Sequence, residues 1–340
     1  MSFKSENWKE ILQQVREGIQ EQNAVVKTED DIVSEEIDAL LENFDVSVWN
    51  RLVNTDLANK NIVTLELRGI WGDPCNHPNL PEMLELFCEK NPSAVIFMTT
   101  SGSFQSTHYW ETLARVLKEK SYFHRVDFNI DGLADTNHIF RRNTDYNKIL
   151  ENVKAFNLAG GNSGWRFQVF NHNKHQVMQA KELAEQIGCM EFSSKRTPGS
   201  EPILIETATE TYNIAFDDID DVEYDTWQFL DDTEMIEVFE KLMGLEITSP
   251  CPWFAQGKIH IDPWGFVWPC SHISSFTYND DPKGIIIDDM FDEHGMFNNL
   301  KENTLAAILS HEWFSETHDR AVTNGKWEVC REECGACGAV

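Results

Sequence analysis

The strongest chemical signal in this 340-residue sequence is a group of cysteines toward its end. Three of the eight cysteines stand singly in the earlier part of the chain, whereas the other five all follow residue 250. In a reducing compartment such thiols are reduced side chains or metal ligands rather than disulfides. Thiolates suit zinc and iron–sulfur clusters equally well. The sequence therefore predicts a metal site whose ligands come from Cys251, Cys270, Cys330, Cys334 and Cys337.

A predicted β-hairpin and a curled tail would bring these cysteines together. Residues 258–262 alternate in polarity, a turn follows at Gly265, and residues 266–268 return, so the flanking Cys251 and Cys270 approach a common end. The tail CREECGAC has closely spaced thiols around a glycine and can wrap one metal centre. A zinc ribbon is the alternative. A ribbon has two knuckles of closely spaced cysteines, but Cys270 comes 19 residues after Cys251, so only the tail cysteines have the spacing of a knuckle.

Three polar, glycine-containing turns follow predicted strands in the middle of the chain. They are GIWGDP at residues 69–74, TTSGS at 99–103 and NIDGLADT at 129–136. Loops at the carboxyl ends of parallel strands are where α/β folds build ligand sites. Glycine lets backbone amides approach a ligand closely, and a carboxylate such as that of Asp131 can bind ribose hydroxyls. Each turn taken singly is typical of an ordinary loop.

The elements that must position these turns alternate along the chain. Short apolar runs predict strands, and amphipathic stretches between them predict helices. This alternation predicts an α/β fold with parallel βα units, which suits a doubly wound sheet as well as a full or partial barrel. The predicted strands are residues 62–67, 94–98, 124–130, 165–170 and 189–192, and the predicted helices are residues 81–90, 109–119, 145–158 and 174–187.

The segments that flank this region have other patterns. Residues 5–22 and 34–44 predict amphipathic helices. Residues 206–226 are rich in aspartate and predict a solvated acidic connector, and a helix is predicted from Thr233 to Met243. His172 and His175 read as surface or hydrogen-bonded side chains rather than ligands.

Composition narrows the classes of partner. Twenty-eight lysines and arginines against 57 aspartates and glutamates give a formal charge of −29. Because such a surface repels phosphate backbones and anionic lipid, we expect no nucleic-acid backbone binding and no membrane binding, and any large partner should be basic. No apolar run approaches the roughly 20 residues that span a bilayer, and residues 1–14 lack the apolar core of a signal peptide. We therefore expect a cytoplasmic protein.

Taken together and in order, these motifs resemble those of radical S-adenosylmethionine proteins, and more closely members with a C-terminal SPASM or twitch domain. The matching segments are GIWGDPCNHPNL, TTSGS, VDFNIDGLADTNHIFRRN and AGGNSGWRFQVFNHNKHQV, with GFVWPC and CREECGAC for the auxiliary domain. The resemblance covers most of the chain and implies a partial (β/α)6 barrel of the TIM type. It also implies an S-adenosylmethionine site.

The resemblance assigns parts of this cofactor to individual positions. The turn Gly72, Asp73 and Pro74 lies where the family holds the methionine amino group. Ser101 and Asp131 lie where it holds other parts of the cofactor, including the ribose. Polar residues of the matching stretches that would face the same cavity are Arg142, Asn171 and Asn173.

The metal prediction also becomes more specific through the resemblance. Cys251 and Cys270, with two or three of the tail thiols, would bind an auxiliary [4Fe–4S] cluster, and zinc stays the alternative metal. Family activity needs a second cluster with one open iron, held by three cysteines spaced C-x3-C-x2-C just after the first barrel strand. That open iron chelates the cofactor's methionine and delivers the electron that cleaves it. No cysteine of this sequence precedes Cys75.

Three explanations of this departure are open. In the first, the chain is a degenerate member that has lost radical initiation. In the second, another polypeptide supplies the missing motif. In the third, the tail itself holds the initiating cluster, because Cys330, Cys334 and Cys337 have the spacing C-x3-C-x2-C. The tail lacks a preceding strand, so we assign it to the auxiliary site. The main hypothesis is a hydrogen-abstracting enzyme that modifies a peptide, nucleotide or small molecule. The alternative is a non-catalytic scaffold or binding subunit with a structural iron–sulfur or zinc site.

These patterns together predict four domains. Residues 1–60 are an N-terminal helical segment, and residues 61–205 are the partial barrel. Residues 206–250 are the acidic connector and its helix, and residues 251–340 are the auxiliary cluster domain.

Overall fold

The computed structural model forms two compact units. It describes residues 46–57, 64–68, 72–195, 203–206, 211–214, 251, 259–262, 264–277, 285–324 and 326–334. The described residues between 64 and 214 belong to one unit, called here the sheet unit. Residues 46–57 and the described residues from 251 onward belong to the other, called here the C-terminal unit.

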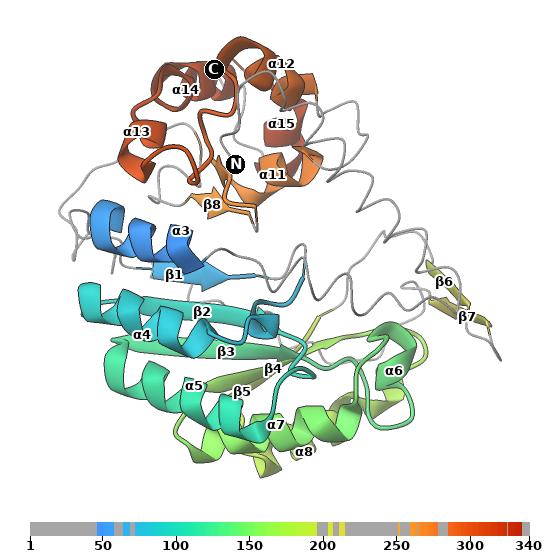
Figure 1. Ribbon diagram of the computed structural model, residues 1–340. Helices are drawn as coiled ribbons and strands as arrows, with labels where there is room; N and C mark the ends of the chain where they lie inside the picture. The colour runs from blue at the N-terminus through green and yellow to red at the C-terminus, as the bar shows by residue number, and fades with distance from the viewer. Residues whose placement is uncertain are drawn as a thin grey trace. The chain divides into compact units, whose positions relative to one another are not determined.

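A five-stranded parallel sheet organises the sheet unit (Figure 1). Its strands pair in their order along the chain: β1 (Thr64–Leu67), β2 (Val95–Thr100), β3 (Phe123–Asn129), β4 (Ser163–Gln168) and β5 (Glu191–Lys195). The crossover helices lie along the same side of the sheet: α4 (Leu80–Lys90), α5 (Thr107–Lys120), α7 (Tyr146–Leu158) and α8 (Val177–Gln186).

This strand order decides between the architectures that the sequence left open. A doubly wound sheet reverses its order once and covers both faces with helices. Four right-handed crossovers in one direction instead place every crossover helix on one face, as in the arc of a barrel. The α/β prediction is confirmed, and five of the six strands of a partial (β/α)6 barrel occur in the described part.

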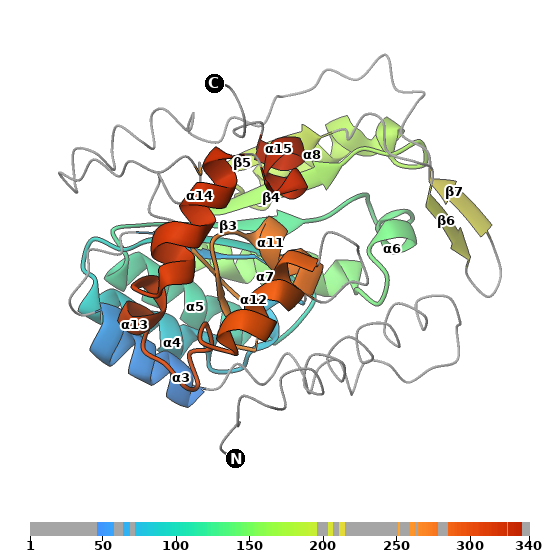
Figure 2. The ribbon, with the colours of Figure 1, turned by 90° about the horizontal axis from the view of Figure 1, so that it is seen from above.

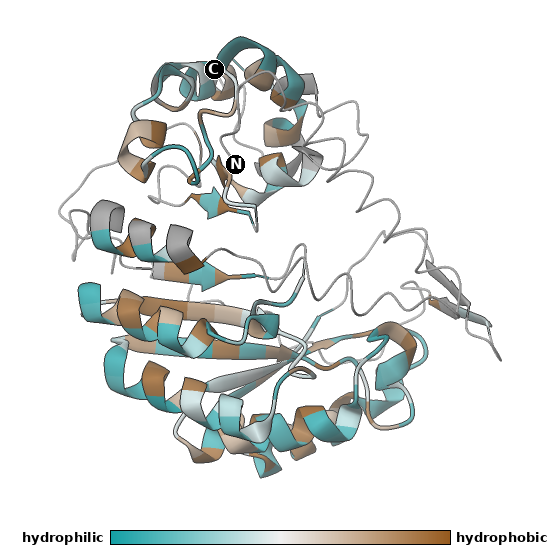
Figure 3. Cartoon of the chain, viewed as in Figure 1, coloured by the Kyte–Doolittle hydropathy of each residue, from teal (hydrophilic) through white to brown (hydrophobic). Residues whose placement is uncertain are grey.

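An aromatic core joins the sheet to its helices. His124, Val126 and Phe128 alternate on β3 and are buried on the helix side. Phe128 lies 5.2 Å from the ring of Trp110 on α5 and 5.9 Å from that of Phe156 on α7. Figure 3 shows brown, hydrophobic stretches on β2 and β3 and alternating teal and brown segments along the crossover helices. This burial explains why short apolar runs were sufficient to predict the strands.

Side-chain caps fix where two of the helices begin. The Ser106 hydroxyl accepts a hydrogen bond from the backbone N–H of Tyr109 at the start of α5. The Asp145 carboxylate does the same for Lys148 at the start of α7. Both caps satisfy backbone donors that the first helical turn leaves without partners.

A β-hairpin spans the predicted boundary between the barrel region and the acidic connector that begins at residue 206. Strands β6 (Ile203–Glu206) and β7 (Thr211–Ile214) pair antiparallel. Ile214 is buried against Ile139 and Phe170, so the hairpin packs beside the short helix α6 (Asn137–Phe140), as Figure 2 shows. Its apolar alternation lies just before the aspartate run, and the rest of the predicted connector is outside the described residues.

The C-terminal unit contains the predicted cysteine-flanked hairpin. Strands β8 (His260–Ile261) and β9 (Val267–Trp268) pair antiparallel, which confirms that prediction. The buried Asp262 carboxylate accepts hydrogen bonds from the backbone of Trp264 and Phe266 and from the Trp268 indole, and so shapes the turn. The unit also contains α3 (Val46–Arg51), a π-helical turn (Leu52–Leu57), α11 (Ser271–Thr277), α12 (Ile285–His294), α13 (Leu305–Leu309), a second π-helical turn (Trp313–Thr317), α14 (His318–Thr323) and α15 (Glu328–Cys334).

Several predicted elements lie outside the described residues. These are the helices predicted at residues 5–22, 34–44 and 233–243. Among the helices that the structure describes, none has the length and apolar character needed to cross a bilayer.

Candidate cofactor site and cysteine cluster

The predicted cofactor residues lie on loops at one edge of the sheet. These residues come after β1, β2, β3 and β4 in the chain, and the carboxyl ends of parallel strands lie at the same edge of a sheet. The residues are Gly72, Asp73, Pro74, Ser101, Asp131, Arg142, Asn171 and Asn173.

Asp73 ties the loop after β1 to the loop after β2. Its carboxylate accepts hydrogen bonds from the backbone N–H of Cys75 at 3.0 Å and from the Thr100 hydroxyl at 2.8 Å. The other oxygen accepts from the Ser101 backbone N–H at 2.6 Å and from the Ser101 hydroxyl at 2.8 Å. These donors occupy the lone pairs of the carboxylate. Asp73 and Ser101 therefore hold the turn in shape, and the neighbouring backbone is the part that can meet a ligand.

Cys75 is a buried thiol directly after this turn. Its Sγ lies 3.3 Å from the Sδ of Met98 on β2. Burial, followed by the charge of Asp73, raises the pKa of Cys75 well above its ordinary value. The group therefore stays a protonated thiol, and its surroundings are those of an inert core cysteine rather than a reactive one.

Asp131 ties the loop after β3 to β4. Its side chain is 1% exposed and accepts hydrogen bonds from the Nε of Arg141 at 2.5 Å and from the backbone N–H of Gln168 at 2.6 Å. Burial raises the pKa of Asp131, and the nearby Arg141 guanidinium counteracts it. Arg141 is the arginine that reaches this carboxylate, and the placement of its neighbour Arg142 in the cofactor cavity stays a prediction.

Asn173 shapes the loop after β4. Its Oδ1 accepts from the backbone N–H of Phe170 at 2.7 Å, and its Nδ2 donates to the carbonyls of Asp131 and Gln168 at 2.8 and 2.9 Å. The residue is fully buried. Because both amide hydrogens and the oxygen are used internally, Asn173 positions the loop and does not present its amide to a ligand.

Gln176, which the sequence analysis did not single out, joins the same two loops. Its Oε1 accepts from the backbone N–H of Leu133 and from the Thr136 hydroxyl, while its Nε2 donates to Asp135 at 2.8 Å. A glutamine just before a helix gives no sequence signal for this role, because its partners lie about forty residues earlier.

The face of the sheet opposite the helices has a charged network that the sequence analysis also missed. Asp127 accepts from Arg125 Nε and from Arg166 Nη2, each at 2.8 Å. Glu191 accepts from Arg125 Nη1 at 2.7 Å, so two arginines neutralise two carboxylates. Gly164 lies beside Asp127, and a Cβ there would meet the Asp127 Oδ1 at 2.3 Å. Glycine at this position makes room for the network.

The thiols of the C-terminal unit are partly placed by the structure. Cys251, Cys270 and Cys330 are each at most 7% exposed. Cys270 directly precedes α11, Cys330 lies on α15, and α11 packs against α15. For Cys334 the structure describes the backbone, and Cys337 lies outside the described residues. No three described histidine, cysteine or acidic side chains are grouped to hold a metal ion, so the five-cysteine site stays a prediction.

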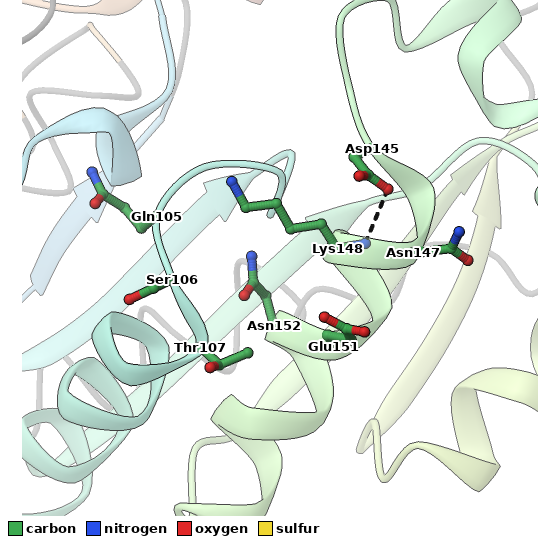
Figure 4. Close-up of a pocket in the computed structure, with 8 residues that line it drawn as sticks. All are labelled: Gln105, Ser106, Thr107, Asp145, Asn147, Lys148, Glu151 and Asn152. Carbon is green, nitrogen blue, oxygen red and sulfur yellow. Dashed lines mark hydrogen bonds between the residues drawn. The ribbon is translucent and has the colours of Figure 1, made fainter.

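A polar hollow of the sheet unit is lined by none of the predicted cofactor residues. It has a volume of about 430 Å³ and lies between the beginnings of α5 and α7. In Figure 4, Lys148 and Asn152 extend from α7 toward the loop that carries Gln105 and Ser106. The remaining lining residues are Thr107, Asp145, Asn147 and Glu151. The mixture of both charges favours no single class of ligand.

Solved structures with a similar course of the chain have S-adenosylmethionine or a precursor peptide bound, by their titles. SuiB of Streptococcus suis bound to S-adenosylmethionine is 13% identical, with 86% of this chain and 63% of SuiB covered and a TM-score of 0.48. Native anSMEcpe with bound AdoMet is 13% identical, with 82% and 73% covered and a TM-score of 0.42. SuiB bound to precursor peptide SuiA is 13% identical, with 81% and 58% covered and a TM-score of 0.43.

These similarities have a limited extent. The chain spans less than two thirds of the length of SuiB. The sequence matches no protein-family model and no curated protein. The assignment of individual residues therefore rests on this chain's own sequence and geometry.

Proposed function

We propose that this chain is an iron–sulfur protein of the radical S-adenosylmethionine type. The cofactor would bind at the carboxyl edge of the sheet unit, and an auxiliary cluster would bind in the C-terminal unit. The observation that carries the proposal is the pair of internal carboxylates at that edge. Asp73 ties the loops after β1 and β2, and Asp131 ties the loop after β3 to the end of β4. Both positions are ones to which the sequence resemblance assigns the cofactor.

The chain's own residues would bind and orient the cofactor. Gly72 has no side chain, so the backbone of its turn can approach the methionine end closely. Asp73 and Ser101 keep that turn against β2. The Asp131–Arg141 pair holds the connection after β3 in shape, and the Asn173 amide ties the loop after β4 to it. When bound, S-adenosylmethionine would supply hydrogen-abstraction chemistry on a peptide, nucleotide or other metabolite.

The donor set of the C-terminal unit fits a cluster better than a hard metal ion. Its buried candidates are sulfur atoms, which select zinc or iron–sulfur over magnesium or calcium. The packing of α11 against α15 supports the idea that Cys270 and Cys330 serve one centre. Radical initiation would come from the tail thiols or from a second polypeptide that carries the C-x3-C-x2-C motif.

Two measurements on the full chain test the proposal. Anaerobic reconstitution should give iron and acid-labile sulfide in equal amounts, and the reconstituted protein should bind S-adenosylmethionine in equilibrium dialysis. Zinc without labile sulfide would refute the cluster, and absent cofactor binding would refute the site. Formation of 5′-deoxyadenosine under reducing conditions then tests activity separately.

A second function, that of a non-catalytic binding subunit, is favoured by one observation. Residues 1–74 contain no cysteine, so the sequence before the Gly-Asp-Pro turn has no thiol with which to hold an initiating cluster. Co-purification with a polypeptide carrying C-x3-C-x2-C, and 5′-deoxyadenosine formation only in its presence, would identify a split enzyme. A chain that binds cofactor and cluster but forms no product with any such partner would be the scaffold.

A further inference from the structure

Three buried polar atoms without hydrogen-bond partners lie together on the loop after β4. They are the Oδ1 of Asn171 and both ring nitrogens of His172. None of these three atoms is hydrogen-bonded to any part of the chain that the structure describes. Buried polar atoms are nearly always paired in folded proteins, because leaving one unpaired costs free energy. Three such atoms on two adjacent residues point to a hydrogen-bonding ligand.

This pair of residues belongs to the predicted cofactor edge. The loop begins after Gln168, whose backbone N–H binds Asp131, and it is closed by Asn173, which binds the Asp131 carbonyl. Asn171 and His172 lie between these two braces. Their backbone is therefore held in place by the same bonds that fix Asp131.

The ring of His172 has a defined orientation and no charge. It stacks on Phe170 with ring centroids 5.5 Å apart and an angle of 12° between the planes, and Phe170 in turn packs on Phe140 at 4.4 Å. Burial, with the nearby His175 and His138, lowers the pKa of His172 to about 4. At neutral pH the ring therefore offers one N–H donor and one lone pair, and Asn171 adds a carbonyl acceptor.

We propose that Asn171 and His172 recognise the adenine ring of the adenosyl ligand at this edge. The proposal rests on the cofactor binding proposed above and assigns the residues that read the base. Adenine is neutral and presents an amino donor beside ring-nitrogen acceptors, which is the complement of this pair, and asparagine amides pair with that edge in other contexts. The layered rings of Phe140, Phe170 and His172 also suit a flat aromatic neighbour.

A free carboxylate or phosphate fits these two residues less well. The Asn171 carbonyl oxygen would face a negative charge, and a neutral imidazole offers a single donor to it. Adenine can donate its amino hydrogens to the Asn171 carbonyl oxygen and to the lone pair of the His172 ring, and its ring nitrogens can accept from the His172 N–H. This difference is what the choice of probe must detect.

The test uses five variants, one of them His172→Gln, and three small probes with the reconstituted full chain. His172→Phe removes both nitrogens and keeps a ring to stack on Phe170, and Asn171→Ala removes the amide. His175→Phe and Asn147→Ala are the matched controls, because both residues are exposed on the same unit. Calorimetry measures the affinity for S-adenosylmethionine, adenosine and inosine, and nitrogen-15 NMR of labelled histidine follows the His172 ring.

The proposal expects about a tenfold loss of affinity for S-adenosylmethionine and adenosine in His172→Phe and in Asn171→Ala. The controls should bind like the wild type, and His172→Gln should recover part of the loss. Inosine should bind more weakly than adenosine, because its carbonyl replaces the amino donor that faces Asn171. Adenosine should shift the His172 nitrogen resonances, and urea midpoints identify any variant that fails to fold.

The outcomes separate this inference from the proposed function. If the wild type and His172→Phe bind S-adenosylmethionine equally, or the His172 resonances do not move, the inference is wrong and the cofactor site stands. If S-adenosylmethionine does not bind but adenosine does, with the expected loss in His172→Phe, the base site stands and the proposed function is wrong. If neither probe binds the wild type, both are wrong.

Discussion

Replacing Asp73 by asparagine tests whether this carboxylate braces the cofactor edge. Asparagine has the same shape, but one of its two terminal atoms is a donor. With nitrogen at the Oδ2 position, the Ser101 N–H at 2.6 Å loses its acceptor and faces another N–H. With nitrogen at Oδ1, the Cys75 N–H at 3.0 Å loses its acceptor instead. Either orientation breaks at least one charge-assisted bond to the backbone.

The expected loss of stability follows from these contacts. A hydrogen bond to a charged group contributes roughly 1.5–3 kcal/mol, and a partly buried N–H left unpaired adds to the cost, so Asp73→Asn should destabilise the fold by about 3 kcal/mol. Asp145→Asn is the matched control, because Asp145 accepts one backbone N–H at the exposed start of α7. Asparagine caps a helix about as well as aspartate does, so Asp145→Asn should cost little stability.

Urea denaturation of both variants and the wild type measures the difference, with circular dichroism as the signal. Cofactor binding should weaken in Asp73→Asn and stay unchanged in Asp145→Asn. If Asp73→Asn is no less stable than Asp145→Asn, the carboxylate is not a brace and the reasoning about the β1 and β2 loops fails.

Three further predictions concern pH, packing and metal. Burial lowers the pKa of His124 to about 4, and its Nε2 accepts a hydrogen bond from the Asn162 N–H. The free energy of unfolding should therefore fall by about 3 kcal/mol as the pH drops from 6.5 toward 4, because the unfolded chain binds a proton that the folded chain does not. In His124→Gln, this dependence of the urea midpoint on pH should vanish. Gly164→Ala should cost about 1–3 kcal/mol by crowding Asp127, and an unchanged urea midpoint would contradict the network's geometry. Cys270→Ser should lose iron and sulfide on reconstitution while Cys88→Ser, on α4 in the other unit, keeps both; full retention in Cys270→Ser would remove that thiol from the site.

The sequence predicted the sheet well because its signals are local. Alternation on β3 puts Val126 and Phe128 on the buried side, and the caps Ser106 and Asp145 begin helices at polar residues that precede apolar periodicity. The hairpin β6–β7 was missed because its four-residue strands stand beside a long acidic run that dominates the composition. Its burial depends on Phe170 and Ile139, which are distant in the sequence.

The choice among polar residues at the edge could not be predicted from the sequence. Arg141 and Arg142 are adjacent and chemically identical, and only the position of Asp131 in space selects Arg141. Asn171 and Asn173 are two residues apart in one loop, yet the amide of Asn173 is used by the backbone while the Oδ1 of Asn171 has no hydrogen-bond partner among the described residues. Such differences arise from tertiary contacts rather than from residue type.

The residues at the cofactor edge therefore have two different roles, because some hold the loops in shape and others are available to contact a ligand. A carboxylate that already accepts four or more hydrogen bonds gains little from a ligand hydroxyl, because the new bond must displace an existing one. Asp73 therefore contributes to binding through the loop conformation it imposes, and substitutions there should lower stability and affinity together. The Oδ1 of Asn171 and the ring nitrogens of His172 have no hydrogen bonds to lose among the described residues, so substitutions that remove these atoms should lower affinity with little effect on stability. Measuring both stability and cofactor affinity in each variant therefore distinguishes a residue that holds a loop in shape from a residue that contacts the ligand.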